Sequence, residues 1–235
     1  LKVHEIPNVG TAGKGKAIVN LVAMHPQEKL ADVCAVKEFR EDRYLLMATR
    51  KGTVKKTPLS AFANPMSRGI IAIAIDEGDE LIAAAVTEPS SEALLATRDG
   101  KAIRFSETDA RPMGRTAYGV KGIELQEGDA VVSMAVVEPE GTLLTVTDLG
   151  FGKRSHIEEY RLQSRGGKGI INVRTTARNG RVVAVLFVQD EDELMVITAQ
   201  GMIVRLRVKD FSVHGRATQG VRLIELGEGD EVVAV

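Results

Sequence analysis

The pattern of apolar and polar residues along this chain predicts short strands joined by turns. Within residues 92–105, "EALLATRDGKAIRF", two β-favouring runs flank Asp99-Gly100, which is the strongest short-range indication of a β-hairpin. Residues 78–86, "GDELIAAAV", form a longer apolar run that is typical of a strand buried on both faces. No stretch of about 12 residues has a convincing helical period, so we expect little helix.

The hairpin frame recurs four times. Each copy reads Thr, two residues, Gly, three residues and then Lys or Arg, and the copies lie at 48–56, 96–104, 146–154 and 197–205. Their threonines are separated by 48, 50 and 51 residues. Farther along, each copy has a glycine followed by Ile or Val: Gly69, Gly119, Gly169 and Gly220. Self-similarity at a nearly fixed period indicates a repeat architecture.

The repeats fill the chain. Complete repeats cover about 43–88, 92–138, 142–189 and 193–235, and residues 1–38 match only the back half of a repeat. Repeats of this length that each form one small antiparallel sheet are typical of blades arranged around an axis. We therefore expect one all-β, propeller-like domain of four-stranded blades, five to six in number, excised from a longer chain.

Composition narrows the class of protein. With 44% hydrophobic and 27% charged residues among 235, the chain has the balance of a soluble globular protein. No apolar run approaches the roughly 18 residues of a membrane span, and the N-terminus has no signal or transit pattern, so we expect a cytoplasmic protein without a membrane partner. The single cysteine, Cys34, lies in an apolar-rich run and is expected to be a buried structural thiol.

The charges are segregated although the net charge is only −1. Stretches that recur once per repeat contain 24 of the 31 lysines and arginines but only 7 of the 32 acidic residues; they are 1–16, 49–68, 97–121, 153–168 and 198–222. One basic run is usually a solvated surface, but four or five runs in register predict a basic band around one edge of the disc. Such a band favours a polyanionic partner.

Double-stranded DNA is the polyanion that fits best. A continuous basic band suits a duplex phosphate backbone, which rewards each neutralised phosphate through counterion release. Few aromatic residues accompany the cations, so stacking on single-stranded bases is less favoured. No recognition helix, zinc finger or RNA-recognition pattern is present, so we expect binding without sequence readout, with the duplex bent around a curved rim.

The glycine-rich segment 163–169, "QSRGGKG", is the most specific candidate for phosphate contact. Its three glycines, Gly166, Gly167 and Gly169, can adopt positive φ angles and allow a close backbone approach, and successive N–H groups in such a turn attract anions. Arg165 can fork onto phosphate oxygens, and Lys168 adds a point charge. The alternative is a loop in which the glycines serve geometry alone.

The residues expected to contact DNA belong to this segment or to the other basic stretches. They are Gln163, Arg165, Gly166, Gly167, Lys168, Gly169, Lys55, Lys56, Arg68, Lys101, Arg104, Arg115, Lys121, Lys153, Arg154, Arg205, Arg207, Arg216, Arg222, Lys14 and Lys16.

Other kinds of site are poorly supported. The four histidines are scattered without metal-ligand spacing, and the acidic clusters such as "EGDE" occupy turn-like segments where solvation explains them. "GTAGKGK" (10–16) lacks the spacing of a phosphate-binding P-loop, and no nucleophile elbow occurs. We expect no active site, metal or cofactor.

Five ordered segments resemble the C-terminal domains of bacterial DNA gyrase A subunits along essentially the whole chain. They are "EIPNVGTAGKGKAIVNL", "MATRKGTVKKTPLSAF", "GRTAYGVKGIELQEGDAVVS", "GFGKRSHIEEYRLQSRGGKG" and "HGRATQGVRLIEL". The resemblance implies a β-pinwheel, a propeller variant whose blades exchange strands with their neighbours and whose rim wraps DNA. It further implies that the domain supports negative supercoiling by DNA gyrase. The expected location is the bacterial cytoplasm, at the nucleoid, and the expected protein partners are the rest of the gyrase A subunit and the gyrase B subunit.

Residues 163–169 resemble the Gln, basic, Arg, Gly, Gly, basic, Gly box of that family at six of seven positions, with Ser164 in place of a second cation. The main box of the family lies in the first blade, so this copy is interpreted as a secondary, box-like element. Three alternatives remain open: the equivalent domain of topoisomerase IV, a propeller that serves as a protein-interaction scaffold, and a repeat-built enzyme with its site at the centre of the disc. An enzyme of this kind would require acidic residues that converge on the axis.

Overall fold

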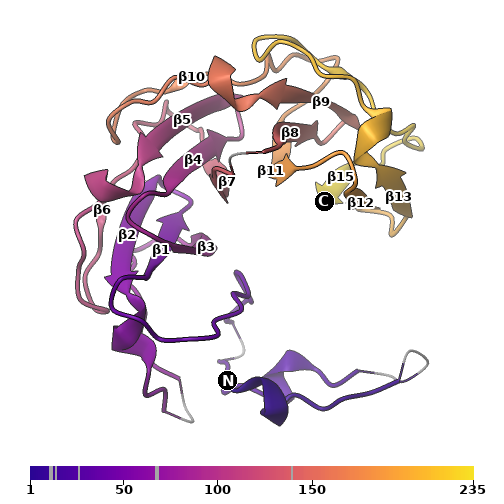
Figure 1. Cartoon of the computed structure of the whole chain (residues 1–235). Coiled ribbons are helices and arrows are strands. Elements are labelled where there is room, and N and C mark those ends of the chain that lie inside the picture. Colours follow the sequence, from indigo (N-terminus) through magenta and orange to yellow (C-terminus); the bar gives the residue numbers. More distant parts are fainter. Residues whose placement is uncertain (11–12, 14, 26, 67–68, 139) are drawn as a thin grey trace.

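The computed structural model describes all of residues 1–235 except 11, 12, 14, 26, 67, 68 and 139. Four antiparallel sheets follow one another around an open arc (Figure 1). The first sheet has the order β3-β1-β2-β6 and consists of Leu81–Thr87, Tyr44–Thr49, Thr53–Pro58 and Val120–Lys121. The second has the order β10-β5-β4-β7 and consists of Ile170–Ile171, Lys101–Ser106, Glu92–Thr97 and Val131–Val136.

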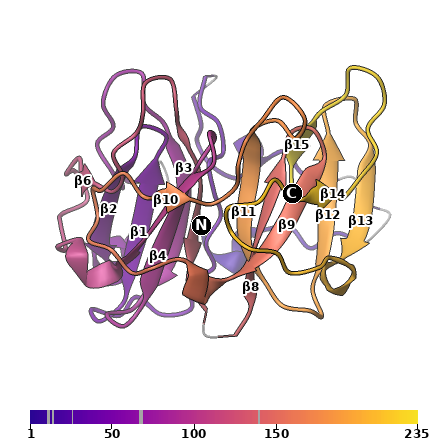
Figure 2. The same cartoon turned by 90° about the horizontal axis from the view of Figure 1, so that it is seen from above.

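The remaining two sheets continue the arc. The third has the order β11-β8-β9-β14 and consists of Val182–Val188, Thr142–Thr147, Phe151–His156 and Val221–Arg222. The fourth has the order β13-β12-β15 and consists of Ile203–Arg207, Glu193–Thr198 and Val232–Ala234. Seen from above, the strands of all four sheets run across the thickness of the arc (Figure 2).

The repeated Thr-x-x-Gly frame forms the hairpin of each blade, as the sequence predicted. In the second blade, β4 pairs with β5 in the register Ala96↔Ala102, and Gly100 closes the turn at φ +88° by donating its N–H to the Thr97 carbonyl at 3.1 Å. The hydroxyl of the buried Thr97 accepts a second bond, from the N–H of Lys101 at 3.1 Å. Glycine is needed here because the left-handed region penalises a Cβ.

Each of the first three blades takes its outermost strand from the next repeat. β6 lies in the repeat that forms the second blade, yet it pairs with β2 of the first blade in the register Val54↔Val120. In the same way, β10 of the third repeat pairs with β5 of the second blade, and β14 of the fourth repeat pairs with β9 of the third blade. This topology is the strand exchange that the resemblance implied, and it makes consecutive repeats structurally interdependent.

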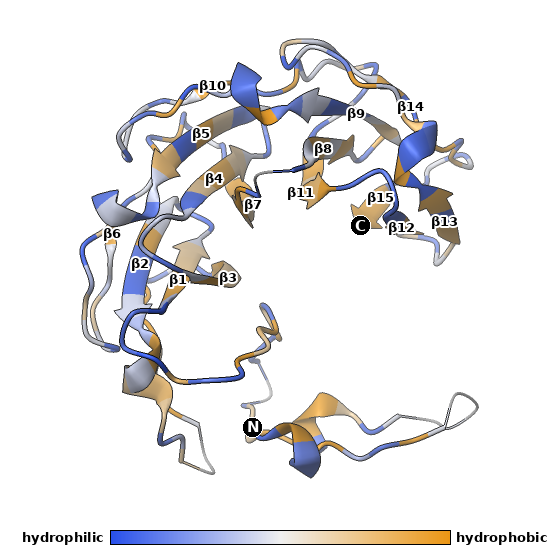
Figure 3. Cartoon of the chain, viewed as in Figure 1, coloured by the Kyte–Doolittle hydropathy of each residue, from blue (hydrophilic) through white to orange (hydrophobic). Residues whose placement is uncertain are grey.

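In each of the first three blades the two hairpin strands are buried more completely than the long apolar strand, which the sequence suggested as the buried one. β8 is buried along its whole length and β1 and β4 over most of theirs. By contrast β3, predicted to be buried on both faces, and its counterpart β7 are mostly half-buried. The reason is position: β1, β4 and β8 lie between two other strands, and β3, β7, β11 and β15 lie at the inner side of the arc (Figure 1). Strongly hydrophobic residues still mark β7, β11 and β15 (Figure 3).

Three apolar clusters hold successive blades together. One joins Leu46 of β1 to Leu95 and Phe105 of the second blade, and the next joins Leu94 to Leu143 of the third. The third cluster joins Leu144 to Val196 of the fourth blade. The core is therefore distributed along the arc, between neighbouring sheets.

Helix content is low, as expected. The described residues contain only 3-10 helices of three or four residues: η1 (Val3–Glu5), η2 (Ile18–Asn20), η3 (Leu59–Phe62), η4 (Glu107–Asp109), η5 (Ile157–Glu159) and η6 (Val208–Asp210). Four sheets are present where five to six blades were expected, because the described part of residues 1–38 contributes η1, η2 and extended backbone without an assigned strand.

Cys34 is half-buried, less enclosed than predicted. Its thiol donates a hydrogen bond to the Ala84 carbonyl at 2.9 Å, and burial raises its pKa, with Asp32 adding to the shift. Among the helices of the described chain, none is long and apolar enough to cross a membrane.

Candidate nucleic-acid interface

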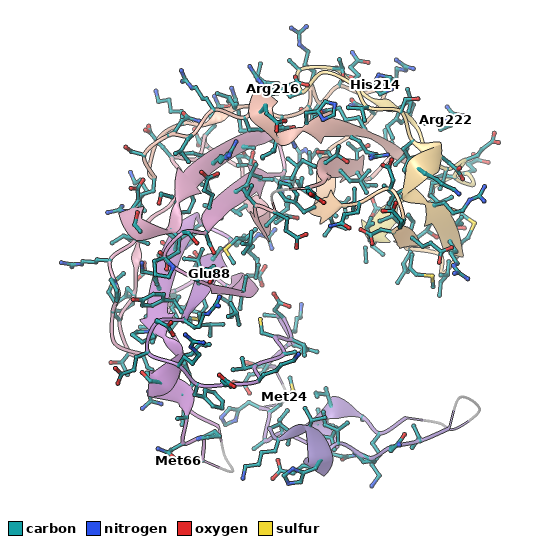
Figure 4. The ribbon with its side chains drawn as sticks, in the orientation of Figure 1. Met24, Met66, Glu88, His214, Arg216 and Arg222 are labelled. Carbon is teal, nitrogen blue, oxygen red and sulfur yellow. The ribbon has the colours of Figure 1, made fainter. Side chains whose placement is uncertain are left out.

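The outer edge of the arc is formed by three loops, defined here as the outer loops: residues 111–121, 161–174 and 213–222. They include the exchanged strands β6, β10 and β14 and lie on the convex side in Figure 1. Together they contain nine lysines and arginines and no aspartate or glutamate. Arg216, His214 and Arg222, all three from the third outer loop, can be seen on this side in Figure 4.

The glycine-rich segment 163–169 lies in the second outer loop and packs on the preceding one. Gly166 and Gly169 have φ angles of +81° and +66°, whereas Gly167 does not have a positive φ. The Gly166 N–H donates to the Gly122 carbonyl at 2.6 Å, and a Cβ on Gly169 would lie 2.5 Å from the Ala102 carbonyl oxygen. Two of the three glycines are thus required by the packing of the loop itself.

Arg165 and Arg216 occupy the same position of successive repeats, four residues before the glycine that precedes the exchanged strand. Arg165 donates from Nε to the Asp109 carbonyl at 2.9 Å and from a terminal nitrogen to the Lys121 carbonyl at 3.0 Å. Arg216 contacts the Ile171 carbonyl, the equivalent of Lys121, one repeat later. Both guanidinium groups therefore fasten an outer loop to the loop before it and are half-buried.

Lys168 is the exposed cation of the glycine-rich segment, and Gln163 lies half-buried near it in the sequence. The Gln163 main-chain N–H donates to the Arg104 carbonyl at 2.9 Å, while its side-chain Nε2 is buried without a partner among the described residues. Lys121 and Arg222, at equivalent positions of β6 and β14, are also exposed. These three cations are free to approach a phosphate group.

Four of the predicted DNA contacts are buried. Lys55 and Lys153 are fully buried and Lys56 and Arg154 are nearly so, which gives them roles inside the fold. Burial lowers the pKa of both Lys55 and Lys153 to about 8. Lys55 contacts the Ala72 and Arg115 carbonyls, and Lys153 donates to the Ser155 hydroxyl at 2.6 Å. In this conformation none of the four can reach a ligand at the surface.

The other predicted residues vary in exposure. Lys16, Arg205 and Arg207 are exposed, and Lys101, Arg104 and Arg115 are half-buried. Arg205 and Arg207 each pair with a carboxylate of their own blade, Glu193 and Asp210. Lys14 and Arg68 lie outside the described residues.

The acidic turns have a structural role that solvation did not suggest. Asp129 of "EGD" accepts bonds at one carboxylate oxygen from the N–H groups of Asp99 and Ala130, at 3.0 and 2.7 Å. Asp79 and Asp230 make the same pair of contacts in the first and fourth blades. Hydrogen bonding, first from Thr198, lowers the pKa of Asp230. Each of these aspartates caps the tip of a hairpin.

The sequence interpretation missed four arginines at or near the outer edge: Arg111 and Arg161, which begin two of the outer loops and are exposed, and Arg174 and Arg178. Arg174 and Arg178 are exposed, and Arg178 and Arg222 lie over the Phe151 ring, 5.1 and 5.5 Å from its centroid. Arg174 ends an outer loop outside the basic stretches that were counted from the sequence. Arg174 lies three residues after the exchanged strand β10, and this closeness in sequence could have placed it at the outer edge.

No group of three His, Cys, Asp or Glu side chains that could hold a metal ion occurs in the described part of the chain.

The chain matches the family model described as DNA gyrase C-terminal domain, beta-propeller. The matched residues are 1–23, 43–88, 91–138, 141–189 and 192–235. The chain is 44% identical over its full length to the DNA gyrase A subunit of Klebsiella oxytoca, of which it covers 27%. It is 48% identical over 99% of its length to the DNA gyrase A subunit of Clostridium acetobutylicum, of which it covers 28%. The chain therefore spans little more than a quarter of these relatives.

Two solved structures have the same fold. The C-terminal domain of DNA topoisomerase IV superposes with a TM-score of 0.90 at 26% identity, covering 99% of this chain and 73% of that one. The DNA gyrase A C-terminal domain superposes with a TM-score of 0.84 at 25% identity, covering 93% of this chain and 73% of that one. Because the family model and the gyrase A relatives extend along all the repeats, the chain belongs to the DNA gyrase C-terminal, beta-propeller family.

Proposed function

We propose that the outer loops bind double-stranded DNA without reading its sequence and bend it around the arc. The observation that carries the proposal is the separation of charge: the outer loops contain nine cationic and no acidic side chains, on the convex edge (Figure 4). Phosphate contacts along such an edge release counterions and offset the cost of bending a stiff duplex.

Within a whole gyrase, this domain would wrap DNA and present it to the B subunit, and to the remainder of the A subunit, supporting negative supercoiling in the bacterial cytoplasm at the nucleoid. The domain supplies charge and curvature, and strand passage belongs to the other parts of the enzyme. Sequence identities of 44 and 48% to gyrase A subunits favour gyrase over topoisomerase IV. The fold does not separate the two, because the topoisomerase IV domain superposes comparably well.

A topological assay tests the proposal. A relaxed circular plasmid is treated with a nicking-closing enzyme in the presence of increasing amounts of the domain, and the products are separated on chloroquine gels. A shift in linking number that grows with protein is expected if DNA follows the arc with one handedness. Binding without any shift would reduce the function to passive attachment. DNA affinity should fall steeply as salt rises, whereas a scaffold would bind a protein partner in a way that survives moderate salt.

A further inference from the structure

The basic residue that ends the repeated Thr-x-x-Gly frame carries an unexpected set of contacts. This position is occupied by Lys56, Arg104, Arg154 and Arg205 in successive repeats. We propose that in the first three repeats it is a positioning residue, called here the blade strut, which fixes the angle between one blade and the next. Its charged group donates hydrogen bonds inside the fold, to backbone carbonyls of the following repeat.

The strut side chains all reach the 3-10 helix of the following repeat. Arg104 donates to the carbonyls of Ile157 and Tyr160, at the first residue and the end of η5, both at 3.1 Å. Arg154 donates to the equivalent carbonyls of Val208 and Phe211, one repeat later, at 3.1 and 3.3 Å.

Lys56 makes the corresponding contact with η4. Its ammonium donates to the Glu107 carbonyl at 3.2 Å and pairs with the Glu107 carboxylate at 2.9 Å. A short lysine point charge with a carboxylate partner therefore replaces the two-carbonyl fork of arginine.

The main chain of each strut residue holds the next repeat as well. The carbonyls of Lys56, Arg104 and Arg154 accept hydrogen bonds from Met113, Gln163 and His214, at 2.8, 2.9 and 2.8 Å. These three donors lie at the beginning of the outer loops. One residue thus fixes both the 3-10 helix and the start of the outer loop that follows it.

Each strut is also anchored within its own blade, twelve residues earlier in the sequence. Lys56 lies over the Tyr44 ring at 4.6 Å, Arg104 binds the Glu92 carboxylate at 2.5 Å and Arg154 binds the Thr142 hydroxyl at 2.8 Å. A side chain held at both ends transmits the orientation of one sheet to the next. Because buried hydrogen bonds of charged groups are costly to break, the joint resists bending.

Exposure separates the struts from the fourth residue of the series. The side chains of Lys56, Arg104 and Arg154 are 5, 19 and 7% exposed, whereas that of Arg205 is 68% exposed and, within the described part of the chain, binds Glu193 of its own blade alone. Arg205 has the same repeat position but contacts no following 3-10 helix among the described residues. It is therefore the matched control.

The consequence for DNA rests on the proposed function: the struts set the curvature along which the outer loops meet the duplex. Removing a strut then loosens the arc without removing a phosphate contact. Relative motion of neighbouring units is the ordinary expectation once a specific interface contact is lost. Bending of DNA should suffer while its affinity persists.

The test uses Arg154→Met, which keeps the length and apolar stem of the side chain. Nitroxide labels are placed at Glu127→Cys and Gln200→Cys in a Cys34→Ser background, and the distance distribution between them is measured without DNA. We expect a distribution about twofold broader for Arg154→Met and an unchanged one for Arg205→Met. Arg104→Lys is expected to retain the narrow distribution, because Lys56 occupies the same position in the first blade.

DNA measurements on the same variants separate the strut from the proposed function. The slope of log K against log salt should stay the same for Arg154→Met, while end-to-end FRET on a bound duplex falls by about half, because bending needs contacts along the whole arc. Unchanged label distances in folded Arg154→Met and Arg104→Met would overturn the strut whatever DNA does. A slope reduced by about one unit with unchanged distances would instead make Arg154 a phosphate ligand. If Arg154→Met does not fold, Arg104→Met, at a less buried position, decides the matter.

Discussion

Glycines at the same position of the repeat experience different surroundings. Gly100 and Gly201 have nearly identical φ angles, +88° and +86°, at equivalent hairpin turns. A Cβ on Gly100 would lie 2.3 Å from the Val173 carbonyl oxygen of the following repeat, whereas a Cβ on Gly201 would meet nothing within 4 Å. The pair separates the cost of backbone strain from the cost of a steric clash.

We predict that Gly201→Ala lowers the free energy of unfolding by about 1 kcal/mol, from backbone strain alone. Gly100→Ala should cost at least about 2 kcal/mol more, since the Val173 backbone must move. Urea denaturation followed by circular dichroism measures both values. Equal costs would mean that the exchanged segment does not pack on the hairpin in solution.

Lys153 is a buried charged residue at a position that the second and fourth blades fill with apolar side chains, Ile103 and Val204. The first blade has a buried lysine, Lys55, at the same position. Burial lowers the pKa of Lys153 from 10.5 to about 8. Between these two values the unfolded chain binds more protons than the folded one, so Lys153 makes the free energy of unfolding rise with pH in that window.

The rise due to this group is at most about 1.4 kcal/mol per pH unit. We predict that Lys153→Met removes it and makes the domain more stable than the wild type at and below pH 8. Ser155 keeps a partner in the variant, because its hydroxyl donates to the His214 carbonyl at 2.8 Å. Chemical denaturation at pH 7, 8, 9 and 10 gives the comparison, and parallel pH curves for the two proteins would contradict the prediction.

At the scale of elements, the outer loops divide their cations between two tasks. Arg165 and Arg216 fasten one loop to the previous loop, whereas Lys168 and Lys121 are exposed. A charge that is already hydrogen bonded to backbone has less to offer a phosphate. The exposed lysines should therefore account for more of the salt-dependent affinity than the loop arginines.

We predict that Lys121→Ala with Lys168→Ala weakens binding to any duplex sequence equally and reduces the slope of log K against log salt by about 1 to 2 units. Folding should hardly change, because exposed charges contribute little to stability. The control is Arg50→Ala with Lys51→Ala, which removes the same charge from a hairpin turn near Glu80 and Asp79. If the two double variants have the same slope, binding follows net charge and not the outer loops.

At the scale of the whole molecule, repeat boundaries in the sequence do not coincide with boundaries of folded units. Cutting the chain after residue 190 would separate two repeats cleanly in sequence. It would also remove β14, the outer strand of the third sheet, together with η6, the acceptor of Arg154. A blade is complete only when the next repeat is present.

We predict that a chain of residues 1–190 has faster amide hydrogen exchange in β9, while β4 of the second blade keeps its protection. The loss should include Gly152, which pairs with Val221, and Arg154, whose carbonyl accepts a hydrogen bond from the His214 N–H. Exchange measured by mass spectrometry on the two chains tests this. Protection of β9 that equals the full-length value would show that the exchanged strand contributes nothing to stability.

The sequence determined the elements of this protein because their causes are local. The Thr-x-x-Gly frame specifies a hairpin within nine residues, and its period of about 50 residues specifies blades. The placement of basic residues in the outer loops was predictable for the same reason. The shared frame therefore forms the same hairpin in every repeat.

Only the tertiary structure decided which cations face the solvent. Lys55, Lys56, Lys153 and Arg154 look like surface charges in a basic stretch, yet the following repeat covers them. Alternation along a strand gives two faces but does not say which face receives a neighbouring blade, because that depends on contacts between residues some 50 positions apart. Arg205, with the same local sequence context, is exposed because no following repeat lies over it among the described residues. Local sequence fixes the position of a charge in its repeat, and long-range packing decides whether that charge binds backbone inside the fold or is available to DNA.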